Sequence, residues 1–312
     1  MSKPPLRSAR WFDADDLRDG GVAWLGLTGG EPLLNPDIVD ITAHASRDMA
    51  VKLFTTGVGL TLSLAEDLTR AGLFSVAVSL DHWESGRHDA SRRYEGAYEA
   101  ALAAIAVFKQ VPGLHVSVSS VLSREMVKSG EVSTLLEFLD SLGVDEAWLS
   151  EVKPSVEDFW SDEYVLSEEE RRMLVRMQDA HNRAVGRREP RGPGAMAVNY
   201  LGHFEGAENF GCNAGNKMVY VDAFGEVGPC VFLPMSFGNV KERPLTEILE
   251  DMRSRFPGED RCFCNKNYRL LQAGDGSGLP LGRDRAVAML EQVRFGPPSE
   301  FNRILLGGRA GS

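Results

Sequence analysis

Short apolar runs alternate with segments of helical periodicity through the first half of the chain. The β-like runs lie at 22–27, 51–55, 75–80, 115–121 and 146–150. The helical segments between them lie at 37–46, 62–71, 97–109 and 132–142. A helix returns the chain to the edge where the next parallel strand begins, so this alternation is typical of parallel strands covered by helices. The pattern predicts an α/β fold, either a barrel or an open doubly wound sheet.

Composition excludes several classes of partner. The 312 residues are 43% hydrophobic, which is enough for a sizeable core, and their net charge is -11. An acidic chain without a concentrated basic patch is a poor ligand for phosphates, so we expect no nucleic acid partner and no anionic membrane partner. The sequence has no apolar run near the ~20 residues of a membrane helix, and its start lacks the apolar core of a signal peptide. We therefore expect a cytoplasmic protein.

The stretch "LGLTGGEPLLNPDIVDI", residues 25–41, ends an apolar run on two glycines and a carboxylate. Gly29 and Gly30 let the backbone turn and approach a ligand without a Cβ in the way. Pro32 and an amphipathic segment at 37–45 predict that a helix follows. The motif is therefore predicted on a strand-to-helix loop, where α/β proteins place their ligand sites.

The last third of the chain contains all four cysteines. Residues 217–230, "KMVYVDAFGEVGPC", predict a hairpin that turns at 222–225 and ends on Cys230. In a reducing compartment, clustered thiols indicate metal ligation more than disulfides. Two kinds of site remain open: an iron–sulfur cluster and a structural zinc ion, each held by Cys212, Cys230, Cys262 and Cys264. A third alternative is that Cys212 or Cys262 is a buried residue without a ligand role.

Three motifs, "LTGGEPLLNPDI", "LFTTGVGL" and "VSLDHWESGRHDASRRYEGAYEAALAAI", together resemble radical S-adenosylmethionine enzymes of the SPASM/twitch group in order and spacing. The resemblance implies a partial (βα)6 barrel of parallel strands with the first strand missing. It implies that a loop of Gly29, Gly30, Glu31 and Pro32 binds the cofactor's amino group, and that Ser79 and Asp81 belong to the loops that hold its ribose and carboxylate. Taken singly, Ser79 and Asp81 indicate an ordinary strand-ending turn, "GRHDASRR" a solvated loop and His88 a surface histidine.

The cysteine spacing extends the resemblance. Twelve residues separate Cys212 from Gly225 and four more precede Cys230, as in the auxiliary-cluster domain of this group. The pair Cys262 and Cys264 departs from the group's denser run and suggests the short form with one auxiliary [4Fe–4S] cluster. The implied organisation is a partial barrel at 1–190, ending near the Gly/Pro/Arg stretch 186–194, an auxiliary-cluster domain of hairpin and helix at 191–275, and a C-terminal loop and helix at 276–312.

One element of the group is absent. Its catalytic cluster is held by a C-x3-C-x2-C loop, whereas this chain has no cysteine before Cys212. Either the sequence starts inside a longer reading frame or the protein has lost that cluster. As written, the chain is expected not to cleave S-adenosylmethionine.

The resemblance implies that a complete enzyme would generate a 5′-deoxyadenosyl radical and modify a peptide or small-molecule substrate, with a reductant such as flavodoxin or ferredoxin. Its cofactors would be S-adenosylmethionine and the auxiliary cluster. Two rivals remain: a non-catalytic protein that binds a peptide or partner and holds a structural iron–sulfur or zinc site, and a zinc-stabilised α/β protein.

Overall fold

The computed structural model describes residues 14–155, 161–186, 196–272 and 279–309. Contacts divide the chain into two compact units. We call residues 23–152 and 166–203 the sheet unit. The described parts of 1–22, 153–165 and 204–312 form the cysteine unit.

The sheet unit contains a parallel six-stranded sheet within the described residues. Its strands are β1 (Trp24–Leu27), β2 (Ala50–Thr55), β3 (Leu73–Ser79), β4 (His115–Leu122), β5 (Glu146–Glu151) and β6 (Ala197–Tyr200). Their order in the sheet follows the chain, whereas a doubly wound sheet reverses direction at a switch point. The predicted α/β fold with barrel-type parallel strands is confirmed.

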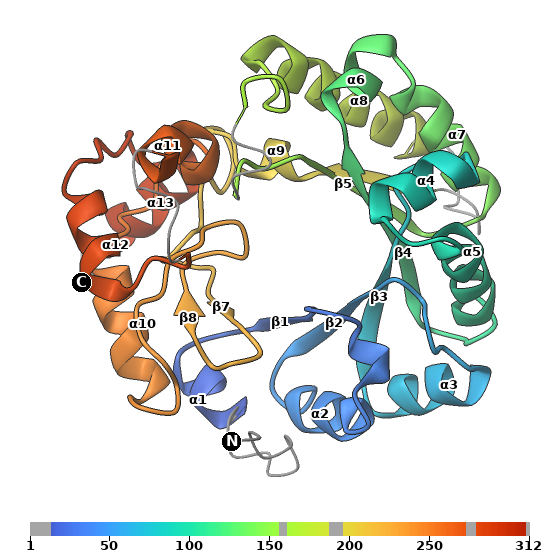
Figure 1. The fold of residues 1–312 in the computed structure, drawn as a ribbon, viewed down its shortest axis with the longest axis horizontal. Helices are drawn as coiled ribbons and strands as arrows, with labels where there is room; N and C mark the ends of the chain where they lie inside the picture. Colours follow the sequence, from blue (N-terminus) through green and yellow to red (C-terminus); the bar gives the residue numbers. More distant parts are fainter. Residues whose placement is uncertain (1–13, 156–160, 187–195, 273–278, 310–312) are drawn as a thin grey trace. The chain divides into compact units, whose positions relative to one another are not determined.

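Helices connect the strands and cover one side of the sheet, which is the outer side in Figure 1. They are η1 (Pro32–Leu34), α2 (Ile38–Ala45), α3 (Leu62–Arg70), α4 (Ser85–Arg92), α5 (Ala97–Phe108), α6 (Arg124–Ser129), α7 (Val132–Ser141) and α8 (Glu168–Gly186); a short α9 (Leu201–Phe204) follows β6. Their apolar stripes pack on alternate strand residues such as Val51, Leu53, Val76 and Val78, which are fully buried.

Local sequence explains where several helices begin. The Thr61 and Ser123 side chains accept hydrogen bonds from the backbone N–H of Leu64 and Met126, so they cap α3 and α6. All five strands expected from the alternation are present. Strand β6 and helices α4 and α6 were not predicted. Residues 187–194 of the expected boundary stretch lie outside the described residues.

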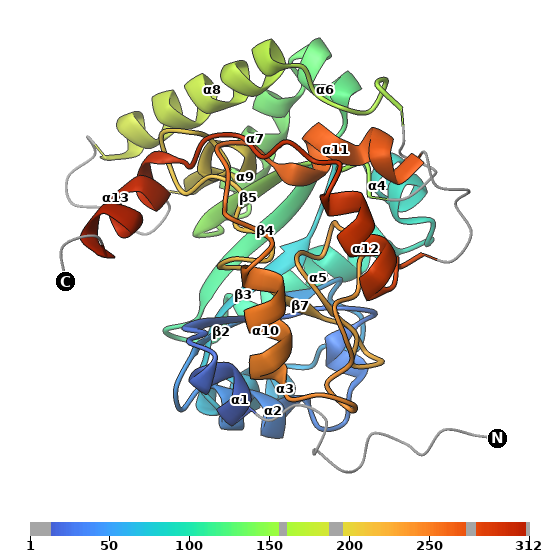
Figure 2. The same cartoon turned by 90° about the vertical axis from the view of Figure 1, so that its left-hand side faces the viewer.

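The cysteine unit is built from short elements. These are α1 (Ala14–Asp19), β7 (Tyr220–Val221), β8 (Val227–Gly228), α10 (Leu245–Arg253), α11 (Phe263–Gln272), α12 (Arg283–Leu290) and α13 (Glu300–Arg309). Strands β7 and β8 pair antiparallel, which confirms the predicted hairpin. Figure 2 shows α1 beside α10, where the Arg253 guanidinium donates to the Gly20 carbonyl at 2.8 Å. Within the described residues, no helix has the length and apolar character needed to span a membrane.

Candidate functional site

The loop after β1 places two glycines and a carboxylate at the carboxyl end of the sheet. Gly29 has φ +98°, a conformation that favours glycine, and a Cβ built on Gly29 or Gly30 would meet no atom within 4 Å. Both residues are exposed. The loop backbone is therefore open to a ligand.

Four donors hold the Glu31 carboxylate against the end of β2. Its Oε1 accepts from the Leu33 N–H at 3.0 Å and from the Thr55 hydroxyl at 2.6 Å. Its Oε2 accepts from the Thr56 N–H at 2.7 Å and from the Thr56 hydroxyl. A carboxylate offers about four acceptor positions, so in this conformation Glu31 fastens the loop to β2. The carbonyl oxygens of the loop remain the groups suited to an ammonium ligand.

A cavity of about 390 Å³ lies at this end of the sheet, within the sheet unit. Its lining residues come from the loops after β1 and β2, the end of β3, helix α4, the loop that follows it and the start of α5: Glu31, Thr56, Val58, Ser79, His88, Arg92, Tyr94 and Ala97. The structure therefore brings the predicted Glu31 and Ser79 to one cavity. Ligands of α/β proteins bind at this end of parallel strands.

Asp81 lies one layer behind the cavity. The Arg92 guanidinium, which lines the cavity, donates to Asp81 Oδ1 at 2.9 Å and pairs with Oδ2 at 2.8 Å. The Val121 N–H also donates to Asp81 Oδ1 at 2.9 Å. Asp81 thus orients Arg92, and the Arg92 guanidinium is a cation of the cavity wall that could bind an anionic group of a ligand.

His88 and its segment differ from the sequence interpretation. "GRHDASRR", interpreted from sequence as a solvated loop, forms most of α4, and His88 is 1% exposed. Its Nδ1 accepts from the Asp81 N–H at 3.1 Å, which places the proton of the neutral ring on Nε2. Burial lowers the pKa of His88, with a smaller opposing effect from Asp81. The expectation of a surface histidine was therefore wrong, because the Asp81 backbone supplies the partner that makes burial acceptable.

The four cysteines meet in the cysteine unit. The Phe263 N–H, between Cys262 and Cys264, donates to Cys212 Sγ at 3.4 Å. The Cys264 thiol donates to the carbonyl oxygen of Phe232 at 3.5 Å, and the Phe232 N–H donates to Cys230 Sγ at 3.5 Å. Hydrogen bonds to the backbone of Phe263 and Phe232 thus bring the sulfurs of cysteines that are far apart in sequence close to one another.

The four cysteines form no disulfide, and Cys212 and Cys264 are buried. Burial raises the pKa of Cys212 to about 11 and, together with neighbouring negative groups, raises the pKa values of Cys230 and Cys262. Among the described residues, no three His, Cys, Asp or Glu side chains are arranged to hold a single metal ion. Thiolate is the form in which cysteine binds iron–sulfur clusters, so a cluster at these residues would have to deprotonate the four thiols on binding.

Sequence reasoning missed Arg92 and the burial of His88. The two residues are four positions apart, so once α4 is recognised as a helix they must lie on one face. That spacing is the signal that could have found them. The close approach of Lys153 and Glu205 to Cys262 had no signal in the sequence, because these residues are 52 to 109 positions apart.

Comparisons with known proteins also separate the cavity region from the cysteine region. Residues 9–125 match the family model of the radical SAM superfamily, and residues 212–267 match the SPASM model of an iron–sulfur cluster-binding domain. The first range contains the glycine loop and the cavity residues, and the second contains all four cysteines.

Relatives and solved structures give the same picture. The chain is 28% identical over 279 residues to an AdoMet-dependent heme synthase of Methanosarcina barkeri, covering 83% of the chain and 79% of that protein. It is 34% identical over 150 residues to a PqqA peptide cyclase of Streptomyces rochei, covering 46% and 39%. Streptococcus suis SuiB bound to S-adenosylmethionine has a TM-score of 0.59 at 16% identity, covering 87% and 68%, and SuiB has also been solved with the precursor peptide SuiA. At this identity the likeness to SuiB establishes a shared fold.

Proposed function

The chain belongs to the radical S-adenosylmethionine superfamily and carries an iron–sulfur cluster-binding SPASM domain, and on that premise we propose that its sheet unit binds S-adenosylmethionine in the cavity beneath the Gly29–Pro32 loop. The families imply S-adenosylmethionine and [4Fe–4S] clusters as cofactors. The observation that carries the proposal is the single cavity shared by Glu31, Ser79 and Arg92.

The cavity fits the functional groups of this cofactor. Its ammonium group suits the carbonyl oxygens of the open loop at Gly29 and Gly30, while Arg92, oriented by Asp81, suits its carboxylate. The Ser79 hydroxyl suits a ribose oxygen. Glu31 keeps the loop in place through Thr55 and Thr56. These residues bind and orient the cofactor.

Cys212, Cys230, Cys262 and Cys264 are proposed as ligands of an auxiliary [4Fe–4S] cluster. The support is that they form no disulfide, that their segments meet, and that one cluster-binding family model spans all four. When bound, the cofactors of this superfamily supply radical abstraction of a hydrogen atom from a substrate. The buried Phe263, which lies between Cys262 and Cys264 in the chain, would help to exclude water from the sulfurs.

We propose a peptide, such as a ribosomally made precursor, as the substrate class, because a PqqA peptide cyclase is 34% identical where it aligns. Heme synthesis is a second candidate, favoured by the greater coverage of the heme synthase relative. A reductant such as flavodoxin or ferredoxin and a cytoplasmic location belong to the same proposal. The family assignment does not favour a purely non-catalytic binding protein.

Cofactor binding is tested by calorimetric titration of the protein with S-adenosylmethionine. Arg92→Met should weaken binding at least tenfold, since the carboxylate loses its cation. Arg87→Met is the matched control on the same helix, because Arg87 pairs with Glu131 and does not line the cavity. Equal affinities of both variants and the parent chain, with unchanged melting temperatures, would remove Arg92 from the site.

Cluster binding is tested by anaerobic reconstitution followed by iron, sulfide and zinc analysis. A brown protein with broad absorbance is expected, and Cys230→Ser should lower iron content. A colourless protein that holds stoichiometric zinc would exclude the cluster. The substrate class is tested by adding candidate precursor peptides or tetrapyrroles to the reconstituted protein and measuring the shift in melting temperature.

A further inference from the structure

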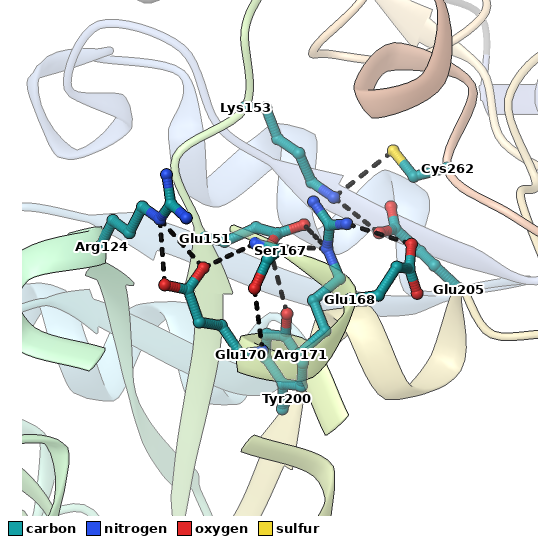
Figure 3. Close-up of polar contacts among 10 residues, drawn as sticks. All are labelled: Arg124, Glu151, Lys153, Ser167, Glu168, Glu170, Arg171, Tyr200, Glu205 and Cys262. Carbon is teal, nitrogen blue, oxygen red and sulfur yellow. Dashed lines mark hydrogen bonds and ion pairs between the residues drawn. The ribbon is translucent and has the colours of Figure 1, made fainter. Parts of the chain in front are cut away.

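A buried lysine lies against one of the cysteine sulfurs. Lys153 Nζ is 3.4 Å from Cys262 Sγ and 2.6 Å from Glu205 Oε2, and all three residues belong to the cysteine unit. Figure 3 shows the lysine side chain extending between the carboxylate and the sulfur. The Lys153 side chain is 1% exposed and that of Glu205 is 18% exposed. The contact is therefore largely shielded from solvent.

The arrangement places a full positive charge beside a thiol in a poorly solvated setting. An ammonium group buried this deeply needs charged or polar partners, because its desolvation is costly. Glu205 is one partner. The sulfur of Cys262 is another.

The charges around Cys262 act in opposite directions. The Glu205 carboxylate and the Lys153 ammonium group place opposite charges beside the Cys262 sulfur. The charge of Glu205 also acts on Cys212 and Cys230. The pair therefore lies where it can bias the charge of the whole group of sulfurs.

We propose that Lys153 donates a hydrogen bond to the Cys262 thiolate and, balanced by Glu205, sets the reduction potential of the auxiliary cluster. The inference rests on the proposed function, since Cys262 must be a cluster ligand. Lys153 is a positioning residue that acts through Cys262. Reduction adds one electron to the cluster from an external reductant such as dithionite; no covalent bond forms or breaks, and Lys153 keeps its proton.

The direction of the effect follows from electrostatics. Hydrogen bonds to cluster sulfurs and nearby positive charge stabilise the reduced, more negative state, so Lys153 raises the potential. Glu205 lowers it by the same reasoning. Removing the lysine charge and removing the carboxylate charge must therefore shift the potential in opposite directions.

The test is an anaerobic redox titration of the reconstituted 312-residue chain, followed by electron paramagnetic resonance. Its only cysteines are the four proposed ligands, so one cluster signal is expected. Lys153→Met should shift the reduction equilibrium at least tenfold towards the oxidised state, a fall of about 59 mV for one electron. Glu205→Gln should shift it towards the reduced state. Lys153→Arg, which keeps the charge, should stay closer to the parent protein than Lys153→Met.

Controls separate the possible failures. Arg283→Met removes a cation of the same unit that pairs with Asp251, and it should leave the potential unchanged. If the parent chain holds no [4Fe–4S] cluster, the proposed function fails at the cysteines. If the parent holds one and Lys153→Met and Glu205→Gln leave the potential unchanged or shift it in the same direction, the inference is overturned. If Lys153→Met does not hold a cluster, the test rests on Glu205→Gln. A reduction potential of Glu205→Gln that is not higher than that of the parent protein then overturns the inference.

Discussion

At the residue scale, two histidines at the carboxyl end of β3 are buried in neutral form. His88 accepts from the Asp81 N–H, and His82 Nδ1 accepts from the Glu84 N–H at 2.9 Å. Burial lowers the pKa of each ring below its ordinary value of 6.5, and the charge of Arg87 lowers that of His82 further. The loop that presents Asp81 thus depends on two uncharged imidazoles.

These shifts predict that acid destabilises the protein below about pH 6.5. In that range the unfolded chain binds more protons than the folded one, so the free energy of unfolding decreases as pH falls. Urea unfolding at pH 7.5 and 5.5 measures this. His88→Asn, whose amide oxygen can still accept from Asp81, should be less stable at pH 7.5 but should lose less stability between the two pH values. A parent protein equally stable at both would contradict the prediction.

At the element scale, α8 begins with a reciprocal cap. The Glu170 N–H donates to the Ser167 hydroxyl at 3.2 Å, and the Ser167 N–H donates to Glu170 Oε2 at 2.6 Å. Figure 3 also shows Arg124 pairing with Glu170, at 2.9 Å. The cap therefore both starts α8 and links it to α6.

Ser167→Ala should lower the free energy of unfolding by about 1 kcal/mol, because the Glu170 N–H loses the hydroxyl that caps it. Chemical denaturation measures the change. Ser133→Ala, an exposed site within α7, is the control and should cost nothing, since alanine favours a helix interior. A similar loss in both variants would mean that the cap contributes no specific stability.

A second feature of this scale is a charged cluster that joins four strands of the sheet. Lys52 on β2 pairs with Glu146 on β5 at 3.3 Å, and His115 on β4 and Asn199 on β6 also contact Glu146. Burial disfavours the charged form of Glu146, but the hydrogen bond of His115 and the charge of Lys52 outweigh it and lower its pKa to about 2. Glu146 is therefore ionised within the sheet.

Lys52→Met should cost about 3 kcal/mol of unfolding free energy, since it leaves a buried carboxylate short of its cation. The control is Arg70→Met, which breaks the exposed pair of Arg70 with Asp67 and should cost under about 1 kcal/mol. Denaturant titrations of the parent protein, Lys52→Met and Arg70→Met measure the two losses of unfolding free energy. Equal losses would show that Lys52 is not the main partner of Glu146.

At the scale of the whole molecule, the two units hold different parts of the proposed chemistry. The cavity belongs to the sheet unit and all four cysteines belong to the cysteine unit. In the radical S-adenosylmethionine enzymes that the sequence resembles, three further cysteines hold a catalytic cluster. The 312 residues contain no cysteine before Cys212. The cofactor in the cavity would then lack the metal that anchors its amino and carboxylate groups in those enzymes.

We therefore predict that this chain, reconstituted with iron, sulfide and a reductant, forms at most one cluster per monomer, binds S-adenosylmethionine weakly and releases no 5′-deoxyadenosine. Hydrogen bonds and one ion pair rarely replace a metal–ligand bond. Iron analysis and chromatography of the nucleoside products measure these outcomes. Release of 5′-deoxyadenosine would require a ligand set that differs from three upstream cysteines.

The sequence by itself determined the features that depend on neighbours along the chain. Periodicity located β1 to β5, because strands and helices repeat with different periods. The glycine motif and the cysteine spacing indicated the superfamily. Strand β6 was not predicted, because it follows directly on a stretch rich in Gly, Pro and Arg, a composition that is typical of loops.

Tertiary structure alone decided which side chains meet. The burial of His88 depends on a backbone N–H supplied by Asp81, the orientation of Arg92 depends on the Asp81 carboxylate, and Lys153 reaches Cys262 across 109 positions of sequence. A charged residue in a sequence is equally compatible with solvent and with a buried partner. Only the folded chain settles the choice, because the desolvation cost of burial is offset by partners that packing brings from other elements.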